Sequence, residues 1–231
     1  KYPHVVLGAI AIFTYVGAEV GNAGLIVNYL KKNLMMTGEE ASTYAAIYWG
    51  GAMVGRFFGS FMFSGISLSK KITYALPVLL LALVSGAFVT GWNWNIGGVF
   101  LGVAVANFLI MQIGTGKAAK TLAIFALVAA ALDLLTTFTT GNVALWTIIS
   151  IGLFNSIMFP NIFSLAVKDL DNAELSSASG LINSLILGGA IIPPIMGSVA
   201  DNFGYTWAFI VPAICYLYIF FYAIRGAQIR R

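Results

Sequence analysis

The stretch VVLGAIAIFTYVGAEVGNAGLIVNYL, residues 5–30, decides the fold class of this chain. It is apolar over at least the roughly 20 residues that a helix needs to cross the hydrocarbon core of a bilayer, which is about 30 Å thick. One carboxylate, Glu19, lies near its middle. An ionisable group at that depth costs about 2.5 kcal/mol or more, so it usually faces a polar cavity, a partner charge or a transport pathway.

The rest of the chain has the same character. Of its 231 residues, 60% are hydrophobic and only 9% are charged. A water-soluble domain of this size could not present such a composition to solvent without aggregating. The sequence therefore predicts an all-α polytopic membrane protein embedded in a lipid bilayer.

Hydrophobic runs recur along the whole length, each bounded by Gly, Asn, Ser or charged residues. They predict eight transmembrane helices, at residues 5–30, 43–64, 72–91, 95–114, 118–139, 143–167, 175–200 and 205–225.

The basic residues orient these spans, because cytoplasmic loops of membrane proteins carry an excess of Lys and Arg. One set of alternate loops holds only Lys31 and Lys32, which are offset by Glu39 and Glu40. The other set holds Lys1, Lys70, Lys71, Lys117, Lys120, Lys168, Arg225, Arg230 and Arg231. Both ends of the chain are therefore predicted to be cytoplasmic.

Several function classes receive no support. The net charge of +4 is spread over short loops, which does not favour nucleic-acid binding. Cys215 and His4 are each the only residue of their type, so no disulfide framework, zinc site or His-based catalytic dyad can be built. The string Gly114-Thr-Gly-Lys117 lacks the spacing of a phosphate-binding loop. We expect no enzyme activity, no cofactor and no metal.

Small residues and prolines indicate how the helices pack. Glycines at spacings that let helix backbones approach each other mark three spans: Gly17 and Gly21, then Gly51, Gly55 and Gly59, then Gly188 and Gly189. Pro160 and the pair Pro193-Pro194 remove backbone donors inside the sixth and seventh spans and should bend or interrupt them. Such breaks are common in secondary transporters, but a simple packing kink is equally compatible with the sequence.

A candidate polar face lies on the first span. Tyr15, Glu19 and Asn22 follow a four-then-three spacing, which stacks them along one side of a helix. A phenol, a carboxylate and an amide together offer donors and acceptors for hydroxyl groups, and the aromatic ring can lie against the apolar side of a sugar. The alternative is that Glu19 bonds a neighbouring helix and only fixes packing.

Three amides near the prolines extend this set. Asn155 and Asn161 flank the Phe159-Pro160 step, and Asn183 lies on the seventh span. Buried amides are costly unless paired, so their coincidence predicts a hydrated or ligand-filled space between helices. We predict that these three asparagines, with Tyr15, Glu19 and Asn22, contact substrate.

Two further charges fall within spans. Asp133 lies in the fifth span, where it could titrate or extend toward the outer boundary. Arg56 lies in the second span and can reach the interface or pair with an acidic group. We interpret both, together with Pro160 and Pro194, as structural or gating residues.

Four strings carry a resemblance to a known family. They are Tyr15-Val-Gly-Ala-Glu-Val-Gly21, Gly55-Arg-Phe-Phe-Gly59, Ser156-Ile-Met-Phe-Pro-Asn-Ile-Phe-Ser-Leu165 and Pro194-Ile-Met-Gly-Ser-Val-Ala-Asp201. In this order they resemble the carboxy-terminal half of the fucose permease and glucose/galactose transporter family, which belongs to the major facilitator superfamily. The similarity covers residues 5–66 and 117–226.

The resemblance implies a proton-coupled sugar symporter of the bacterial inner membrane, in which two six-helix halves alternate access to a central cavity. This chain would be one half, and the amino-terminal six-helix half would be its missing partner. The first, fourth and fifth helices of each family half tend to border the cavity, and here these are the first, sixth and seventh spans. The family's carboxylates most implicated in proton coupling lie in the other half, so Glu19 is expected to accept hydrogen bonds from sugar rather than to couple protons.

Residues 67–116 depart from the family pattern. Within a single transmembrane domain of residues 1–231, they form an extra helical hairpin, which should lie outside the cavity. The start at Lys-Tyr-Pro-His, without methionine, suggests a fragment. Two other functions stay open: a non-transporting scaffold or assembly subunit, and a transporter for another small polar solute.

Overall fold

A computed structural model describes residues 2–114 and 116–229. The described residues form the helices α1 (Pro3–Asn33), α2 (Gly38–Met62), α3 (Leu68–Val89), α4 (Trp94–Ile113), α5 (Ala118–Phe138), α6 (Gly141–Asn155), α7 (Met158–Ala166), α8 (Asn172–Ser184), α9 (Gly188–Phe203), α10 (Tyr205–Ala208) and α11 (Ile210–Ile224), with 3₁₀ turns η1 (Leu185–Leu187) and η2 (Gly226–Gln228).

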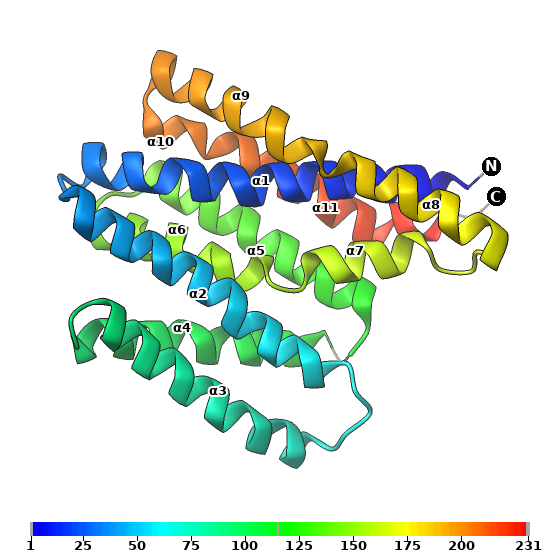
Figure 1. Cartoon of the computed structure of the whole chain (residues 1–231), viewed down its shortest axis with the longest axis horizontal. Helices are drawn as coiled ribbons and strands as arrows, with labels where there is room; N and C mark the ends of the chain where they lie inside the picture. The colour runs from blue at the N-terminus through cyan, green and yellow to red at the C-terminus, as the bar shows by residue number, and fades with distance from the viewer. Residues whose placement is uncertain (1, 115, 230–231) are drawn as a thin grey trace.

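These elements make eight rods, because α6 continues into α7, α8 into α9 through η1, and α10 into α11 (Figure 1). Seven rods in the described part of the chain are long and apolar enough to cross a membrane. The remaining rod, α2, is 25 residues long but carries Glu39 and Glu40 in its first turn and Arg56 further along. Seven of the eight predicted spans are therefore supported by their length and apolar composition. The eighth, α2, is supported by its packing among the other helices.

The rods run roughly side by side, and the two chain ends lie at the same end of the bundle (Figure 1). The α2–α3 and α7–α8 connections, the end of α4 and the start of α5 lie at that end too. These connections and the adjoining helix ends hold Lys70, Lys71, Lys117, Lys120 and Lys168, so the basic residues gather at one end of the bundle, as predicted. Lys1, Arg230 and Arg231 lie outside the described residues.

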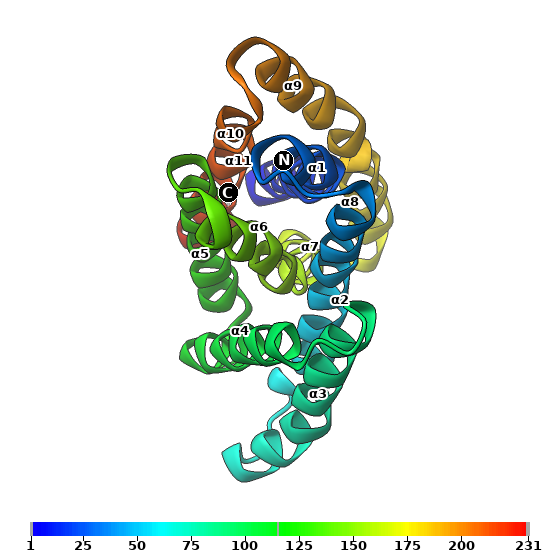
Figure 2. The same ribbon diagram turned by 90° about the vertical axis from the view of Figure 1, so that its left-hand side faces the viewer.

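Helix α1 is the centre of the fold. Seen along the bundle, it is flanked by α2, α9 and α11 (Figure 2), and it packs against each of them. Its buried residues include large side chains with almost no exposure, such as Ile12, Tyr29 and Leu30. An apolar helix surrounded on most sides is expected at the core of a helical membrane domain.

Helices α3 and α4 form an antiparallel hairpin at one side of the molecule, next to α2 (Figures 1 and 2). Gly91 and Trp92 take the left-handed conformation that reverses the chain. Asn93 then caps α4, because its side-chain oxygen accepts hydrogen bonds from the backbone N–H groups of Asn95 and Ile96, at 3.1 and 3.4 Å. The hairpin occupies the region predicted at 67–116.

The predicted glycine faces are contact faces. A Cβ atom on Gly55 of α2 would meet Ser156 at the α6–α7 break, and one on Gly17 of α1 would meet Ile192 of α9. The approach is closest at Gly188, where a Cβ would overlap the backbone carbonyl oxygen of Phe13. Backbone-to-backbone packing of this kind replaces the hydrophobic force that lipid cannot supply.

The prolines act in two ways. The sixth rod is interrupted at Ser156 and Ile157, one turn before Pro160, as expected for a residue that lacks the N–H and crowds the preceding turn. Pro193 and Pro194 instead lie within α9, and the seventh rod narrows to a 3₁₀ turn at η1, before α9 begins. The interruption predicted near Pro160 is therefore present, whereas Pro193 and Pro194 continue a regular helix and the 3₁₀ turn of the seventh rod lies upstream of them.

The Gly188 contact generates a stability prediction. We expect Gly188→Ala to destabilise the fold by about 1–3 kcal/mol, the usual cost of overpacking, because its neighbour is backbone and cannot rotate away. The measurement is thermal unfolding of the purified protein in detergent. Gly197→Ala is the matched control: it lies on the same helix with no atom within 4 Å of the added Cβ. Equal melting temperatures for the two variants would contradict the prediction.

Candidate substrate-binding face and its polar network

Glu19 is paired with a cation from the neighbouring helix. Its Oε1 lies 3.7 Å from Nη2 of Arg56, which reaches across from α2. The Glu19 side chain is 12% exposed and the Arg56 side chain 57% exposed, so the pair opens toward the surface. A partner charge is one of the settings in which an intramembrane carboxylate is tolerated.

Tyr15 lies one turn before Glu19 and is almost completely buried. Its hydroxyl lies beside the Glu19 carboxylate and donates a hydrogen bond of 3.0 Å to the backbone carbonyl of Asn155. Its ring meets Phe159 edge to face, with centroids 6.2 Å apart. Tyr15 therefore links the charged pair of α1 and α2 to the break between α6 and α7.

Asn155 is the hub of a buried network. Its amide nitrogen donates to the hydroxyl of Tyr48 at 2.9 Å, and its amide oxygen accepts from the hydroxyl of Tyr216 at 2.7 Å. The Tyr48 hydroxyl in turn donates to the backbone carbonyl of Glu19 at 3.1 Å. Four helices, α1, α2, α6 and α11, thus meet at one asparagine.

The amide group of Asn155 is therefore used inside the protein, and its side chain is 0% exposed. Its predicted contact with substrate stays a prediction, and the geometry assigns it first to support of Tyr15 and Glu19. The signal for its partners was weak, because Tyr48 and Tyr216 in apolar helices look like ordinary packing residues.

Asn161 and Asn183 differ in placement. Asn161 of α7 is 6% exposed and its Nδ2 has no hydrogen-bond partner in the described structure. Asn183 is exposed near the end of α8. Pro160 on α7 and Pro194 on α9 are exposed as well. An unpartnered buried amide and an exposed one are both free to bind a ligand or water.

Asn22 and Asp133 form a second polar pair, apart from the Tyr15–Glu19 cluster. Both side chains are 0% exposed, and Asn22 Nδ2 lies 3.5 Å from Asp133 Oδ2. Asp133 therefore does not extend to the outer boundary, which was one of the two options that its position left open. Asn22 is turned toward α5 rather than toward Arg56.

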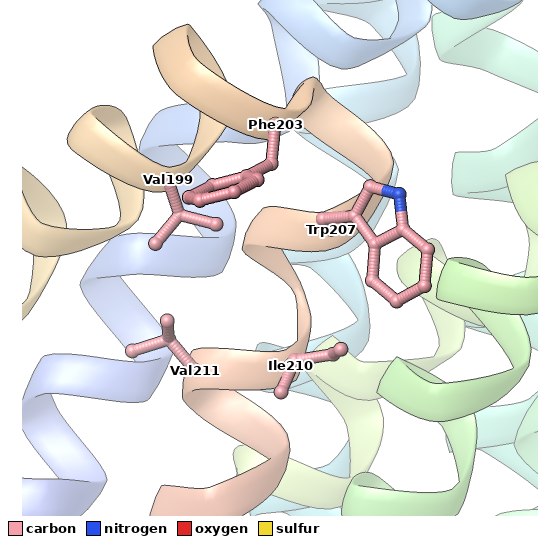
Figure 3. Close-up of a pocket in the computed structure, with 5 residues that line it drawn as sticks. All are labelled: Val199, Phe203, Trp207, Ile210 and Val211. Atoms are coloured by element: carbon pink, nitrogen blue, oxygen red, sulfur yellow. The ribbon is translucent and has the colours of Figure 1, made fainter.

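An apolar hollow lies elsewhere, between α9 and the start of the last rod (Figure 3). It is lined by Val199, Phe203, Trp207, Ile210 and Val211. None of the predicted polar residues reaches it, and its lining offers no acceptor for a hydroxyl-rich solute.

The chain is similar to named sugar transporters. It is 38% identical over 230 residues to the glucose/galactose transporter of Brucella abortus, covering 99% of this chain and 43% of that protein. It is 34% identical over 232 residues to a putative glucose/galactose transporter of Helicobacter pylori, covering 98% and 44%. It is also 37% identical over 130 residues to the L-fucose-proton symporter of Escherichia coli, covering 56% and 29%. No protein-family model matches it.

A solved structure has the same fold. The chain matches a major facilitator superfamily transporter, FucP, crystallised in the outward conformation, with a TM-score of 0.69 and 26% identity, over 97% of this chain and 42% of that one. The chain thus spans less than half the length of the relatives it matches. The apolar helices and the relatives together show that the chain is an integral membrane protein. The relatives are transporters and not enzymes.

The Asn155 hub gives a prediction. Asn155→Ala removes the acceptor of the buried Tyr216 hydroxyl and the donor to the Tyr48 hydroxyl, which keeps its bond to the Glu19 carbonyl. We therefore expect a loss of about 1–3 kcal/mol in unfolding free energy, the cost of an unsatisfied buried polar group. Thermal or denaturant unfolding in detergent measures it. Asn172→Ala, at an exposed position at the start of α8, should change little. An Asn155→Ala protein as stable as the control would show that the network contributes nothing.

Proposed function

Because the chain is homologous to, and folds like, the carboxy-terminal half of the fucose permease and glucose/galactose transporter family of the major facilitator superfamily, we propose that it forms that half of a sugar transporter. The observation that carries the proposed sugar contact is the Glu19–Arg56 pair, a partly exposed carboxylate and guanidinium next to a buried network. The relatives are named for glucose, galactose and L-fucose, so a hexose or fucose-type sugar is the proposed substrate.

The charged pair suits a hydroxyl-rich ligand. A carboxylate is an acceptor with two oxygens, and an Arg guanidinium offers several donors, so neighbouring hydroxyls of one sugar can bond both. Arg56 also places a positive charge 3.7 Å from the Glu19 carboxylate. We assign Glu19 as a direct acceptor and Arg56 as its orienting partner.

Further groups are added to the proposed site. The partly exposed Phe159 ring packs edge to face on the buried Tyr15, one turn from Glu19, and we add Asn161 of α7 and Asn183 of α8 as proposed amide contacts. These residues lie on α1, α7 and α8, the rods predicted to border the cavity. The hairpin of α3 and α4 lies on the far side of α2 from α9, in keeping with a position outside the cavity.

We further propose symport with protons by alternating access, carried out together with an amino-terminal half. The proposal draws on the L-fucose-proton symporter among the relatives and on their greater length. In this scheme Glu19 contacts sugar and does not carry the coupling proton.

Sugar affinity tests the site. In the full-length protein in proteoliposomes, Glu19→Gln removes a charged acceptor; hydrogen bonds to charged groups contribute about 1.5–3 kcal/mol, so we expect a roughly 10- to 100-fold loss of affinity for galactose or fucose. Arg56→Gln should lower affinity less, because Arg56 is mainly an orienting residue. Binding is measured with labelled sugar.

Glu39→Gln is the matched control, because Glu39 is exposed in the first turn of α2, away from the pair. The pH profile of uptake separates the two roles of Glu19. Weakened binding with proton coupling retained supports a sugar contact, whereas sugar exchange that persists with coupling lost would make Glu19 the coupling residue.

The proposed location is the bacterial inner membrane with both ends cytoplasmic. Ser69 and Thr140 are exposed at opposite ends of the bundle. We expect a Ser69→Cys variant to react with a membrane-impermeant thiol reagent only after cells are opened, and a Thr140→Cys variant to react in intact cells. Cys215 is 6% exposed and provides an unreactive background. The reverse labelling pattern would invert the topology.

A further inference from the structure

Asp133 is not among the residues assigned to the proposed sugar site. Of the acidic residues that the structure describes, only Asp133 is completely buried, with 0% of its side chain exposed. It lies on α5, which packs against α11, and α11 in turn packs against α1. The proposed function assigns it no role.

Its surroundings contain no cation. Asn22 of α1 donates to Asp133 Oδ2 at 3.5 Å, and Oδ1 has no hydrogen-bond partner. Tyr48 of α2 and Cys215 and Tyr216 of α11 lie close enough to interact with it electrostatically. Within residues 2–114 and 116–229, no Lys, Arg or His contributes to its environment.

A carboxylate cannot remain ionised cheaply in such a place. Burial of an isolated charge is unfavourable unless a counter-charge or several hydrogen bonds compensate for the lost water, and the group takes up a proton instead. One long hydrogen bond from an amide does not compensate for a full charge.

The Asn22 amide, like the Asp133 carboxyl group, has one oxygen without a hydrogen-bond partner. Asn22 Oδ1 is buried and has no donor, and Asp133 Oδ1 is buried and has no donor either. A proton on Asp133 Oδ1 turns that atom into a donor. The acid O–H can then bond the amide oxygen while the amide N–H bonds the other acid oxygen, which satisfies both side chains at once.

We propose that Asp133 and Asn22 form a proton-binding site inside the helix bundle, in which Asp133 is a neutral carboxylic acid paired with the Asn22 amide. The pair joins α1 to α5 without any charge. This site does not depend on the proposed sugar transport. A metal cation is the less suitable ligand, because hard cations take about six or more oxygens and only two unpartnered ones are available.

Infrared difference spectroscopy tests the site directly. The full-length protein and an Asp133→Asn variant are reconstituted in lipid vesicles at neutral pH, and their carbonyl regions are compared. We expect the wild type to show the C=O band of a protonated carboxylic acid and the variant to lack it. Asn22→Leu should keep the band but move it to higher frequency, because the acid has then lost its hydrogen-bonded partner.

Two controls separate the alternatives. Glu19→Gln should leave the Asp133 band unchanged, because Glu19 is paired with Arg56. Replacement of sodium by choline should also leave it unchanged, whereas a band that appears only without sodium would identify a cation site and overturn the proposal.

A difference spectrum that shows loss of a carboxylate band, and not of an acid band, would overturn it as well. If Asp133→Asn fails to fold, the comparison of wild type with Asn22→Leu gives the same decision: an unshifted carbonyl region refutes the pair.

Discussion

The hydrocarbon core of a bilayer offers no hydrogen-bond partners, so a break in a membrane helix there must be satisfied by the protein or by water in a cavity. The break after Asn155 is where this constraint shapes the whole molecule. The backbone carbonyl of Asn155 lies outside the regular helical pattern and accepts a hydrogen bond from the Tyr15 hydroxyl. The nearby Ser156 hydroxyl donates a hydrogen bond to the carbonyl of Leu153. The side chain of Asn155 then binds Tyr48 and Tyr216. The break is thus the point at which four helices are fixed in register.

The same network determines where the charged pair lies. The Tyr48 hydroxyl donates a hydrogen bond to the backbone carbonyl of Glu19, so the Glu19 carboxylate is free to reach Arg56. An ion pair that is partly open to solvent adds little stability by itself, which argues that its placement serves recognition more than folding. A rigid frame behind a partly exposed charged group is the arrangement that binding sites generally need.

Much of the fold could be predicted from the sequence because bilayer physics leaves few options. Span length, glycine spacing and the end on which Lys70, Lys117 and Lys168 gather all follow from local rules. Helix α2 is less apolar than the other spans because of its glutamates and Arg56, and its place in the bundle follows from its packing against α1 and α6.

The candidate site was harder to predict. The spacing of Tyr15, Glu19 and Asn22 places them on one broad side of α1, but spacing cannot say which helix each will meet. Tyr15 meets the α6–α7 break, Glu19 meets α2 and Asn22 meets α5. Asn155 was selected for its residue type, yet its partners Tyr48 and Tyr216 carry no recognisable pattern, because their role depends on contacts between distant segments.

The contact between Gly188 and Phe13 has a mechanical consequence. Two side chains in contact can slide past each other by changing rotamer, but two backbones cannot. A shift of α9 along α1 that placed Leu187 at this point would bring a side chain against the Phe13 carbonyl, so shear in that direction is opposed. The close contact therefore favours rotation of α1 and α9 as one body over sliding in that direction.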